Sequence, residues 1–407
     1  MIHSKDRKMP SLKPHINFHK RAHATEKMNR NNICFSTLFG YTISMVLKTT
    51  DRCWKTFGFG RYLLNALIGK PFLVFFNYFL FLLDNVFYKD YQKINLVKPV
   101  FITGHPRSGT TFLHRLLSQT EEFTCFEFWN TVFSSLVARK ILSPIDRIIK
   151  NRSQDAVFVK ESGHFISWNS IEEEEFLLLG CYNSPMASLF TGLAFGKEDF
   201  WDLFYFDEQP KILNNEIMKY FTGCLKRQVY YLGRKQILAK MPYAMLRFQS
   251  FIKAFPDAKF VYLIRSPLDV VPSYLSLIRA ILDDLWGLGN IPPSLLELIY
   301  KRIYDQSIRY YQWVDELEDK GILNPNQFMT LPYNLLKTDL TKALSLFSEF
   351  TEIRFSDKLK NEILKLSKKQ KTYQREHQNM ALEDFGFSRD SVLQDFDFVF
   401  DKYGFDK

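Results

Sequence analysis

The stretch from Val100 to Ser118 constrains the fold of this chain more than any other part of its sequence. A short apolar run, Val100–Thr103, is followed by Gly104-His105-Pro106-Arg107-Ser108-Gly109-Thr110-Thr111 and then by an apolar helical pattern. Glycines allow the backbone to turn tightly and to approach a ligand closely. Free amide groups and the helix dipole favour negative charge at the start of the helix. This strand, loop and helix therefore predict an α/β fold with an anion-binding site.

The loop has the glycine spacing of a nucleotide P-loop but lacks its lysine. Thr110 occupies the lysine position of G-x-x-x-x-G-K-[ST], and a basic residue appears earlier, at Arg107. The P-loop lysine reaches the β- and γ-phosphates of a bound nucleotide. Its absence therefore favours a shorter anion of the 5′-diester type over a triphosphate.

Short strands separated by helical patterns extend over the rest of the chain. The expected strands are residues 100–103, 236–239, 260–264 and 327–331, and the expected helices are residues 110–118, 244–255, 268–281, 294–318 and 338–350. Strands that alternate with helices indicate a central parallel sheet covered on both faces. We therefore expect a P-loop NTPase-like, three-layer αβα fold whose ligand lies beyond the carboxyl ends of the strands.

A second motif follows the predicted strand Phe260–Ile264. Arg265-Ser266-Pro267 ends this strand and begins a helix, and Ser273 lies eight residues beyond Arg265. An arginine at a strand end can offer a planar, bidentate fork to a phosphate, and a nearby serine hydroxyl can add a donor. From these residues alone, a salt-bridged arginine beside a surface serine is an equal alternative.

These segments resemble the sulfotransferase family. Phe101–Gln119 is similar to that family's 5′-phosphosulfate-binding loop, and Phe260–Leu277 to its 3′-phosphate-binding segment. The resemblance extends to Leu238–Pro242, Phe255–Ala258 and the segment from His377 to Phe387. It covers roughly residues 95–400 and is closest to the large bacterial-type group of the family.

The resemblance implies a P-loop-like fold that binds 3′-phosphoadenosine 5′-phosphosulfate and transfers its sulfuryl group to a hydroxyl or an amine. The donor-binding residues that it implies are Pro106, Arg107, Ser108, Gly109, Thr110, Thr111, Arg265 and Ser273. Two departures bear on the donor contacts. Arg107 stands where the cytosolic aryl enzymes carry lysine, and the C-terminal basic, glycine-containing motif of those enzymes is not seen.

Sulfuryl transfer needs in-line positioning, stabilised charge on the transferring group and a general base for the acceptor hydroxyl. The resemblance favours Glu127, twenty residues beyond Arg107, as the base, and Arg107 as the stabilising cation. His105 and His164 are alternative bases. Lys240 follows a predicted strand and is either a catalytic cation or a surface lysine.

Other charged and metal-binding side chains give weaker signals. The acidic run Glu172–Glu175 is interpreted as a solvated helix face, and Arg247 as a surface cation. No cluster of His, Cys, Asp or Glu has the spacing of metal ligands, so no metal site is predicted. The five cysteines include no C-x-x-C pair, which favours reduced thiols and weakly favours the cytoplasm.

The formal net charge of +10 is concentrated at the N-terminus. Residues 1–31 carry eight Lys and Arg residues against two acidic residues. No nucleic-acid-reading motif accompanies this charge, so no nucleic-acid partner is predicted, and an anionic membrane surface is the sharper alternative to a solvated tail. We expect three parts: a basic tail at residues 1–31, an apolar helical region at residues 32–94 and a sulfotransferase domain at residues 95–407.

The apolar region contains two segments that bear on membrane association. Ile33–Leu47 is shorter than the roughly 20 residues that span a bilayer. Pro71–Tyr88 is longer but contains Asn77 and Asp84, and a charge inside a spanning helix is unfavourable. We expect helices that pack on the protein or lie in a membrane interface, through a peripheral contact of residues 1–90. A cytoplasmic or membrane-associated location is favoured over a Golgi-type anchor.

The acceptor stays open at this point. An aromatic-rich stretch at residues 125–236 suits a carbohydrate, a lipid or another small molecule. Two alternatives to a sulfotransferase also remain. One is a P-loop-type kinase or NTPase, which the missing loop lysine disfavours, and the other is a non-catalytic membrane-associated relative, which the intact motifs disfavour.

Overall fold

The computed structural model describes most of the chain outside the N-terminal tail. The described residues are 37–119, 122–151, 156–158, 166–196, 203–233, 236–370 and 379–407. The basic tail at residues 1–31, His164, and the start of the predicted C-terminal segment at His377 lie outside them.

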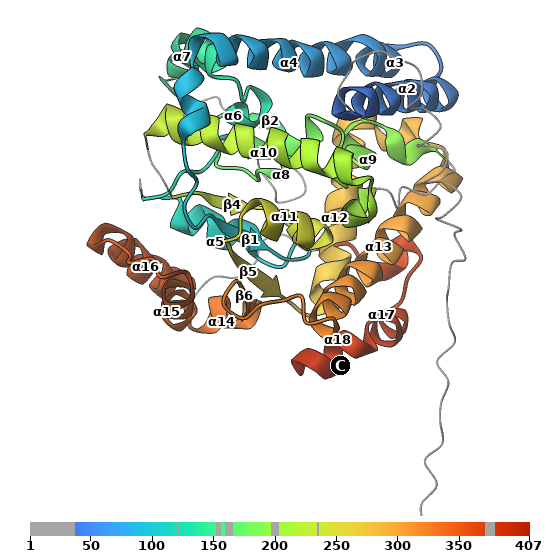
Figure 1. Cartoon of the computed structure of the whole chain (residues 1–407). Coiled ribbons are helices and arrows are strands. Elements are labelled where there is room, and N and C mark those ends of the chain that lie inside the picture. Colours follow the sequence, from blue (N-terminus) through green and yellow to red (C-terminus); the bar gives the residue numbers. More distant parts are fainter. Residues whose placement is uncertain are drawn as a thin grey trace, which may run out of the picture. The chain divides into compact units, whose positions relative to one another are not determined.

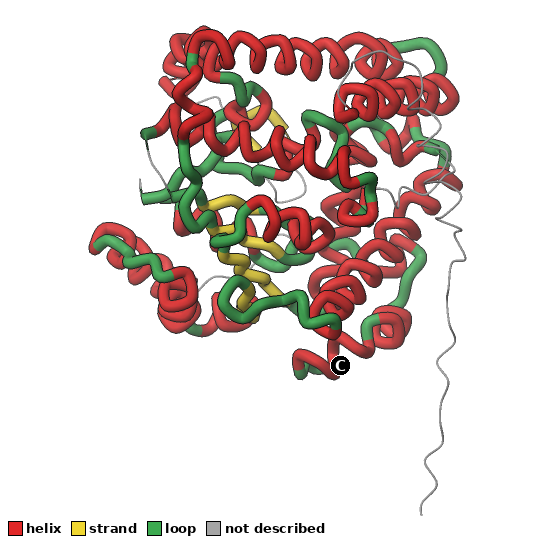
Figure 2. The backbone as a smooth tube through the Cα atoms, viewed as in Figure 1, coloured by secondary structure: helices red, strands yellow, loops and turns green. Residues whose placement is uncertain are grey.

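A parallel sheet of four strands forms the centre of the described chain (Figures 1 and 2). In spatial order the strands are β4 (Leu238–Lys240), β1 (Val100–Thr103), β5 (Lys259–Ile264) and β6 (Phe328–Pro332). Every neighbouring pair is parallel, and Ile102 of β1 lies opposite Lys240 on one side and Val261 on the other. The parallel sheet predicted from the sequence is therefore confirmed.

Helices cover both faces of this sheet, as the alternation of buried strand residues requires. Phe101 and Tyr262 pack into one apolar cluster, and Ile102 and Val261 pack into another. The first cluster includes residues of α10 (Lys211–Leu232), α11 (Phe248–Ala254), α12 (Pro267–Trp286) and α13 (Pro293–Asp319). The second includes residues of α5 (Thr110–Leu117), α15 (Leu340–Thr351) and α16 (Asp357–Gln370). This arrangement is the predicted three-layer αβα fold.

Further elements connect these layers. They are α6 (Phe128–Val132), α7 (Leu136–Asn151), α8 (Glu175–Leu179), α9 (Ala187–Phe190), α14 (Tyr333–Thr338), α17 (Arg389–Asp395), α18 (Asp397–Tyr403) and the antiparallel pair β2 (Ala156–Phe158) and β3 (Ile166–Ser167). The helix predicted at residues 338–350 begins two residues later, because the side chain of Asp339 caps it by accepting a hydrogen bond from the amide of Lys342 at 2.9 Å.

Apolar helices precede the sheet, as predicted. They are α2 (Thr37–Phe57), α3 (Arg61–Leu64), the π-helical turn η2 (Asn65–Gly69) and α4 (Lys70–Phe87). Among the described residues, the continuous helix Arg61–Phe87 is long and apolar enough to cross a membrane by length and composition, and 28% of its most apolar window is buried. The boundary near residue 95 stays a prediction.

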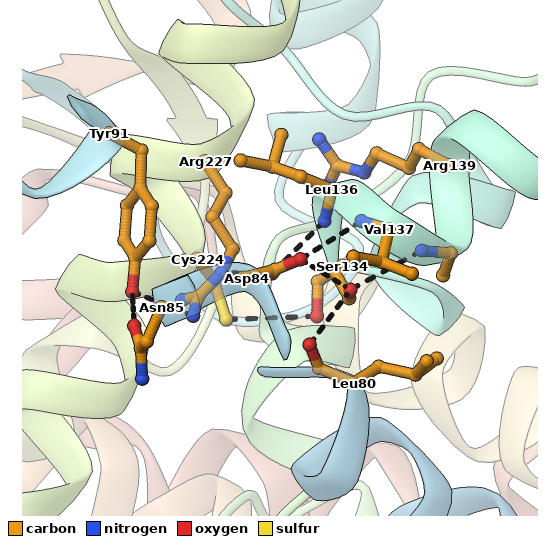
Figure 3. Close-up of polar contacts among 12 residues, drawn as sticks. Leu80, Asp84, Asn85, Tyr91, Ser134, Leu136, Val137, Arg139, Cys224 and Arg227 are labelled. Carbon is orange, nitrogen blue, oxygen red and sulfur yellow. Dashed lines mark hydrogen bonds and ion pairs between the residues drawn. The ribbon is translucent and has the colours of Figure 1, made fainter. Parts of the chain in front are cut away.

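A buried carboxylate attaches α4 to the rest of the protein (Figure 3). Asp84 is fully buried and its Oδ2 accepts a hydrogen bond from Arg227 Nε at 2.7 Å. Its oxygens also accept hydrogen bonds from the Ser135 hydroxyl at 2.9 Å and from the amides of Leu136 and Val137 at 3.1 and 2.9 Å, at the start of α7. An ionised carboxylate is tolerated in this apolar helix because each oxygen has donors and a cation is adjacent.

Replacing Asp84 with alanine should destabilise the fold strongly, because it leaves the Arg227 guanidinium buried without its counter-ion. We expect the free energy of unfolding to fall by about 3–5 kcal/mol, measured by urea unfolding. Asp51→Ala breaks the exposed Asp51–Lys55 pair and is the matched control, with a far smaller effect expected. Equal destabilisation by the two substitutions would contradict an anchoring role for Asp84.

Candidate active site

Two glycines hold the loop between β1 and α5 in an unusual shape. Gly104 and Gly109 have φ angles of 143° and 99°, and Arg107 between them has a φ of 75°. A Cβ on Gly104 would lie 2.5 Å from the carbonyl oxygen of Leu263, and a Cβ on Gly109 would lie 2.6 Å from the ring of Tyr333. The loop is therefore packed against β5 and the start of α14, and only glycine fits at both positions.

The loop and the start of α5 have the features of an anion cradle. Ser108 is fully buried, and its hydroxyl oxygen has no hydrogen-bond partner among the described residues. A buried polar atom without a partner is unfavourable, so this hydroxyl fits the role of a ligand-binding group. The amides of the first turn of α5 have no partner within the helix. The loop residues that line the adjoining cavity are Pro106, Arg107, Gly109, Thr110 and Thr111.

The structure brings the second motif against the first. Arg107 Nε donates a hydrogen bond to the Ser273 hydroxyl at 3.0 Å, and Arg265 Nη1 donates to the carbonyl oxygen of Arg107 at 3.2 Å. Arg265 also pairs with Asp269 at 3.2 Å and stacks over the ring of Tyr333. Arg107 of the glycine-bounded loop thus contacts Arg265, which follows the neighbouring strand β5, and Ser273 of α12, as expected for a site that binds an anion with more than one charged group.

A cavity of about 870 Å³ opens from this cradle. Its polar end carries Arg107, Thr111 and Arg265, together with Glu173 from the acidic segment before α8. Its other walls are mainly apolar and include residues of α8, α9 and α12. Apolar and aromatic lining residues include Phe176, Met186, Leu189, Tyr243, Tyr274 and Ile278. A concave, mostly apolar site with a few convergent polar groups is typical of a small-molecule pocket.

Lys240 lies inside this site rather than at the surface. It ends β4, and its side chain is 2% exposed. Its ammonium group donates a hydrogen bond to the Thr111 hydroxyl at 2.9 Å and lies 3.2 Å from Glu173 Oε2. Both partners line the cavity, so Lys240 places a positive charge between the anion cradle and a carboxylate.

Glu173 is a site residue that the sequence analysis missed. It belongs to the run Glu172–Glu175, which was expected to be a solvated helix face, and this expectation is wrong. Glu172, Glu174 and Glu175 are fully buried. The available signal was the apolar segment Phe176–Leu179 that follows directly, because its burial carries the chain into the core immediately after the acidic run.

Each of the buried glutamates has its own polar partner. Glu172 accepts a hydrogen bond from Arg115 at 2.6 Å, and Glu174 accepts one from the backbone amide of Lys240 at 2.6 Å. Burial raises the pKa of Glu174 well above its usual value, although the amide bonds oppose this shift. The segment is therefore fixed to α5 and to β4, and this attachment holds Glu173 beside Lys240.

Arg247 is likewise buried, which corrects its interpretation as a surface cation. It is 2% exposed, donates hydrogen bonds to the side chain and the carbonyl oxygen of Asn183 at 2.9 and 2.7 Å, and lies 3.6 Å from Glu175. Burial raises the pKa of Glu175 to about 7, while the positive charge of Arg247 opposes the shift.

His105 is a packed core side chain. Its Nε2 lies 3.0 Å from the Ser307 hydroxyl, its Nδ1 lies 2.8 Å from the carbonyl oxygen of Pro106, and its ring stacks on Tyr311. Burial lowers the pKa of His105 to about 4, so the ring is neutral near pH 7. His105 is not among the described residues that line the cavity, and this placement disfavours it as the general base.

Glu127 also lies away from the cavity. It precedes α6 and accepts a hydrogen bond from Trp129 Nε1 at 2.7 Å, and it is not among the described lining residues. His164 lies outside the described residues. In the described part of the chain, no group of three or more His, Cys, Asp or Glu side chains is placed to hold a metal ion.

Comparisons with known proteins agree with this geometry. Residues 99–357, more than half of the chain, match the sulfotransferase family. Among curated relatives, the omega-hydroxy-beta-dihydromenaquinone-9 sulfotransferase Stf3 of Mycobacterium bovis and that of Mycobacterium tuberculosis are each 24% identical over 308 residues, which cover 74% of this chain and 67% of theirs.

Solved structures show the same fold. Sulfotransferase STF9 from Mycobacterium avium has a TM-score of 0.67 at 14% identity, covering 97% of this chain and 98% of its own. Sulfotransferase STF1 from Mycobacterium tuberculosis H37Rv has a TM-score of 0.60 at 16% identity, covering 93% and 97%. The expected fold and enzyme class are confirmed: this chain belongs to the sulfotransferase family and is a transferase with a P-loop-like αβα fold.

Proposed function

We propose that the protein transfers the sulfuryl group of 3′-phosphoadenosine 5′-phosphosulfate to the hydroxyl of an apolar small molecule. The observation that carries this proposal is that Arg265 and Ser273 contact Arg107 of the glycine-bounded loop, at the polar end of a mainly apolar cavity. The donor enters as a co-substrate, and the acceptor occupies the apolar part of the cavity.

The two charged ends of the donor match the two motifs. The loop, the first amides of α5 and the buried Ser108 hydroxyl suit the 5′-phosphosulfate, because they present several donors to one anion. Arg265 and Ser273 suit the 3′-phosphate, since Arg265 directly precedes α12 and Ser273 lies in the second turn of that helix, next to the loop. In this arrangement the loop binds only the 5′-phosphosulfate, so it needs no P-loop lysine to reach the phosphates of a triphosphate.

The reaction needs few groups from the protein. The acceptor oxygen attacks sulfur in line, the bond from sulfur to the bridging phosphate oxygen breaks, and that bond's electron pair stays on the phosphate. The products are a sulfate ester and adenosine 3′,5′-bisphosphate. Arg107 and Lys240 offer positive charge where negative charge develops on the transferring and leaving oxygens.

We assign the general base to Glu173. Its carboxylate lines the cavity, its side chain is 14% exposed, and it lies 3.2 Å from the Lys240 ammonium that contacts Thr111 in the donor loop. The other carboxylate in the lining, Asp269, is paired with Arg265 and is 58% exposed. Glu173 is therefore the acid best placed to accept the proton that the acceptor hydroxyl releases.

An apolar acceptor is supported by the walls of the cavity and by the relatives. The relative Stf3 is named for a hydroxylated dihydromenaquinone, which is a lipid-type molecule. At 24% identity this name does not transfer as such, but an apolar alcohol fits the lining of aromatic and aliphatic side chains in this chain.

A membrane contact is supported by the outer face of the apolar helices. On α4, Phe72, Phe79 and Leu82 are each more than half exposed. Exposed apolar residues of this kind continue on α7 with Ile141 and Ile148, and α7 packs beside α4 (Figure 1). Exposed basic residues lie on α7, at the ends of the helix Arg61–Phe87 and on α2, and they are Lys140, Arg147, Arg61, Lys89, Lys48 and Lys55. We propose that this face rests on an anionic membrane surface, with the compartment staying a prediction.

Arg265→Ala should reduce selectivity for the 3′-phosphorylated nucleotide. In calorimetric titrations, we expect adenosine 3′,5′-bisphosphate to bind the wild type at least about 10-fold more tightly than ADP, because charge-assisted hydrogen bonds add roughly 1.5–3 kcal/mol. The substitution should remove most of this difference. Arg389→Ala, at an exposed arginine of α17, is the matched control. Tighter binding of ATP with magnesium than of the bisphosphate would favour a kinase instead.

Glu173→Gln should abolish turnover while leaving donor binding intact. Removing a general base lowers kcat by about 10²–10⁴-fold, whereas the affinity for adenosine 3′,5′-bisphosphate should change little. Sulfated product would be measured with radiolabelled donor and farnesol as acceptor. Glu127→Gln is the control and should retain activity. The opposite pattern, with Glu127→Gln inactive and Glu173→Gln active, would return the base to the position predicted from the sequence.

Replacing Phe72, Phe79 and Leu82 together with serine should weaken membrane binding, because their burial in the interface contributes apolar transfer energy. In flotation with phosphatidylserine-containing liposomes, we expect most of the wild type and little of the variant to float. Leu364→Ser on α16, also at an exposed leucine, is the control. Equal flotation of the two proteins would contradict the proposed membrane contact. If the wild type proves to be a dimer and the triple variant a monomer, this face would instead be an interface between two copies of the chain.

A further inference from the structure

A second cavity lies against the inner face of α4. It measures about 200 Å³, and α4 contributes Leu73, Val74 and Phe81 to its wall. Val132 at the end of α6 and Leu179 at the end of α8 also line it. Most of its walls are therefore aliphatic or aromatic, and none of the five residues named here lines the catalytic cavity.

The two cavities adjoin each other. Ile166, Phe176, Phe190 and Ile281 line both of them. Phe176 and Phe190 meet edge to face with their ring centroids 5.8 Å apart, so aromatic side chains form the shared wall. Side chains without polar atoms can rearrange around an apolar chain without leaving a buried hydrogen-bonding group unsatisfied.

The short segment from Glu173 to Leu179 connects the catalytic cavity with the second cavity. Glu173, Phe176 and Leu179 follow one another at three-residue intervals. Glu173 lines the catalytic cavity, Phe176 lines both cavities, and Leu179 lines the second. The segment from Glu173 through α8 therefore extends from the catalytic cavity to the cavity behind α4, and α4 also carries the exposed residues Phe72, Phe79 and Leu82.

We propose that the cavity behind α4 binds the far end of a long apolar chain on the acceptor, while the hydroxyl of that acceptor lies beside Glu173. The inference rests on the proposed sulfuryl transfer and adds the kind of acceptor: an alcohol whose chain is long enough to pass the Phe176 wall. Short alcohols occupy the catalytic cavity alone, so the second cavity acts as a selector of chain length.

Filling the second cavity should remove the advantage of long acceptors only. With geraniol, farnesol and geranylgeraniol as probes, we expect kcat/KM of the wild type to rise at least about 10-fold over the series, as more apolar surface is buried. In Leu179→Trp this rise should disappear, while kcat/KM for geraniol and the affinity for adenosine 3′,5′-bisphosphate stay unchanged. Leu364→Trp, at an exposed leucine of α16, is the matched control.

A labelling measurement covers the case in which Leu179→Trp does not fold. A long-chain alcohol with a diazirine at its chain end should label the wild type on the peptide containing Leu73–Phe81 or on that containing Val132, as mapped by mass spectrometry. Equal kcat/KM across the alcohols, or labelling elsewhere, would overturn this inference and leave the sulfotransferase proposal standing. Failure of the wild type to sulfate any of the alcohols would overturn both.

Discussion

The parallel pairing of β1 with β5 places the donor-binding groups of this protein. The carboxyl ends of parallel neighbours lie at the same edge of a sheet, so the loops that follow them must meet. Arg265 consequently donates to the backbone of Arg107, and Arg107 reaches the Ser273 hydroxyl, across 158 and 166 residues of sequence. The tight fit of Gly104 against Leu263 holds the loop to β5 at this edge.

Buried carboxylates organise the remainder of the site. A charge inside a protein is tolerated only when a cation or several hydrogen-bond donors accompany it. Glu172 meets this requirement through Arg115. Glu174, whose pKa burial raises, accepts hydrogen bonds from the amides of Phe126 and Lys240, and these contacts fix the segment before α8 against the sheet. Asp84 meets the requirement through Arg227 and thereby fixes α4. The walls of both cavities depend on these two attachments.

Features of this protein whose cause is local could be predicted from the sequence. A glycine-bounded loop between a β-type run and an apolar helix can be recognised from a few consecutive residues, and so can an arginine at the end of a strand. Side chains that contact a partner far away in sequence could not be placed in this way. Arg247 was taken for a surface cation because Asn183 lies 64 residues away from it.

The assignment of the general base also depends on contacts between distant segments. The resemblance to sulfotransferases favours Glu127, twenty residues beyond Arg107, but a resemblance in sequence does not specify which way this side chain points. In the folded protein Glu127 contacts Trp129, whereas Glu173 lies beside Lys240. Nothing in the run Glu172–Glu175 distinguishes Glu173 from its neighbours until β4 supplies the lysine.

The sequence alone therefore determined the αβα fold, the anion loop and the membership of the sulfotransferase family, because each depends on patterns within short segments. Only the tertiary structure decided which acid faces the cavity, how an apolar helix accommodates Asp84 and where a second cavity adjoins the first. These features depend on contacts between distant segments, and the physical reason is that burial and charge pairing are properties of the packed chain rather than of any one stretch of it.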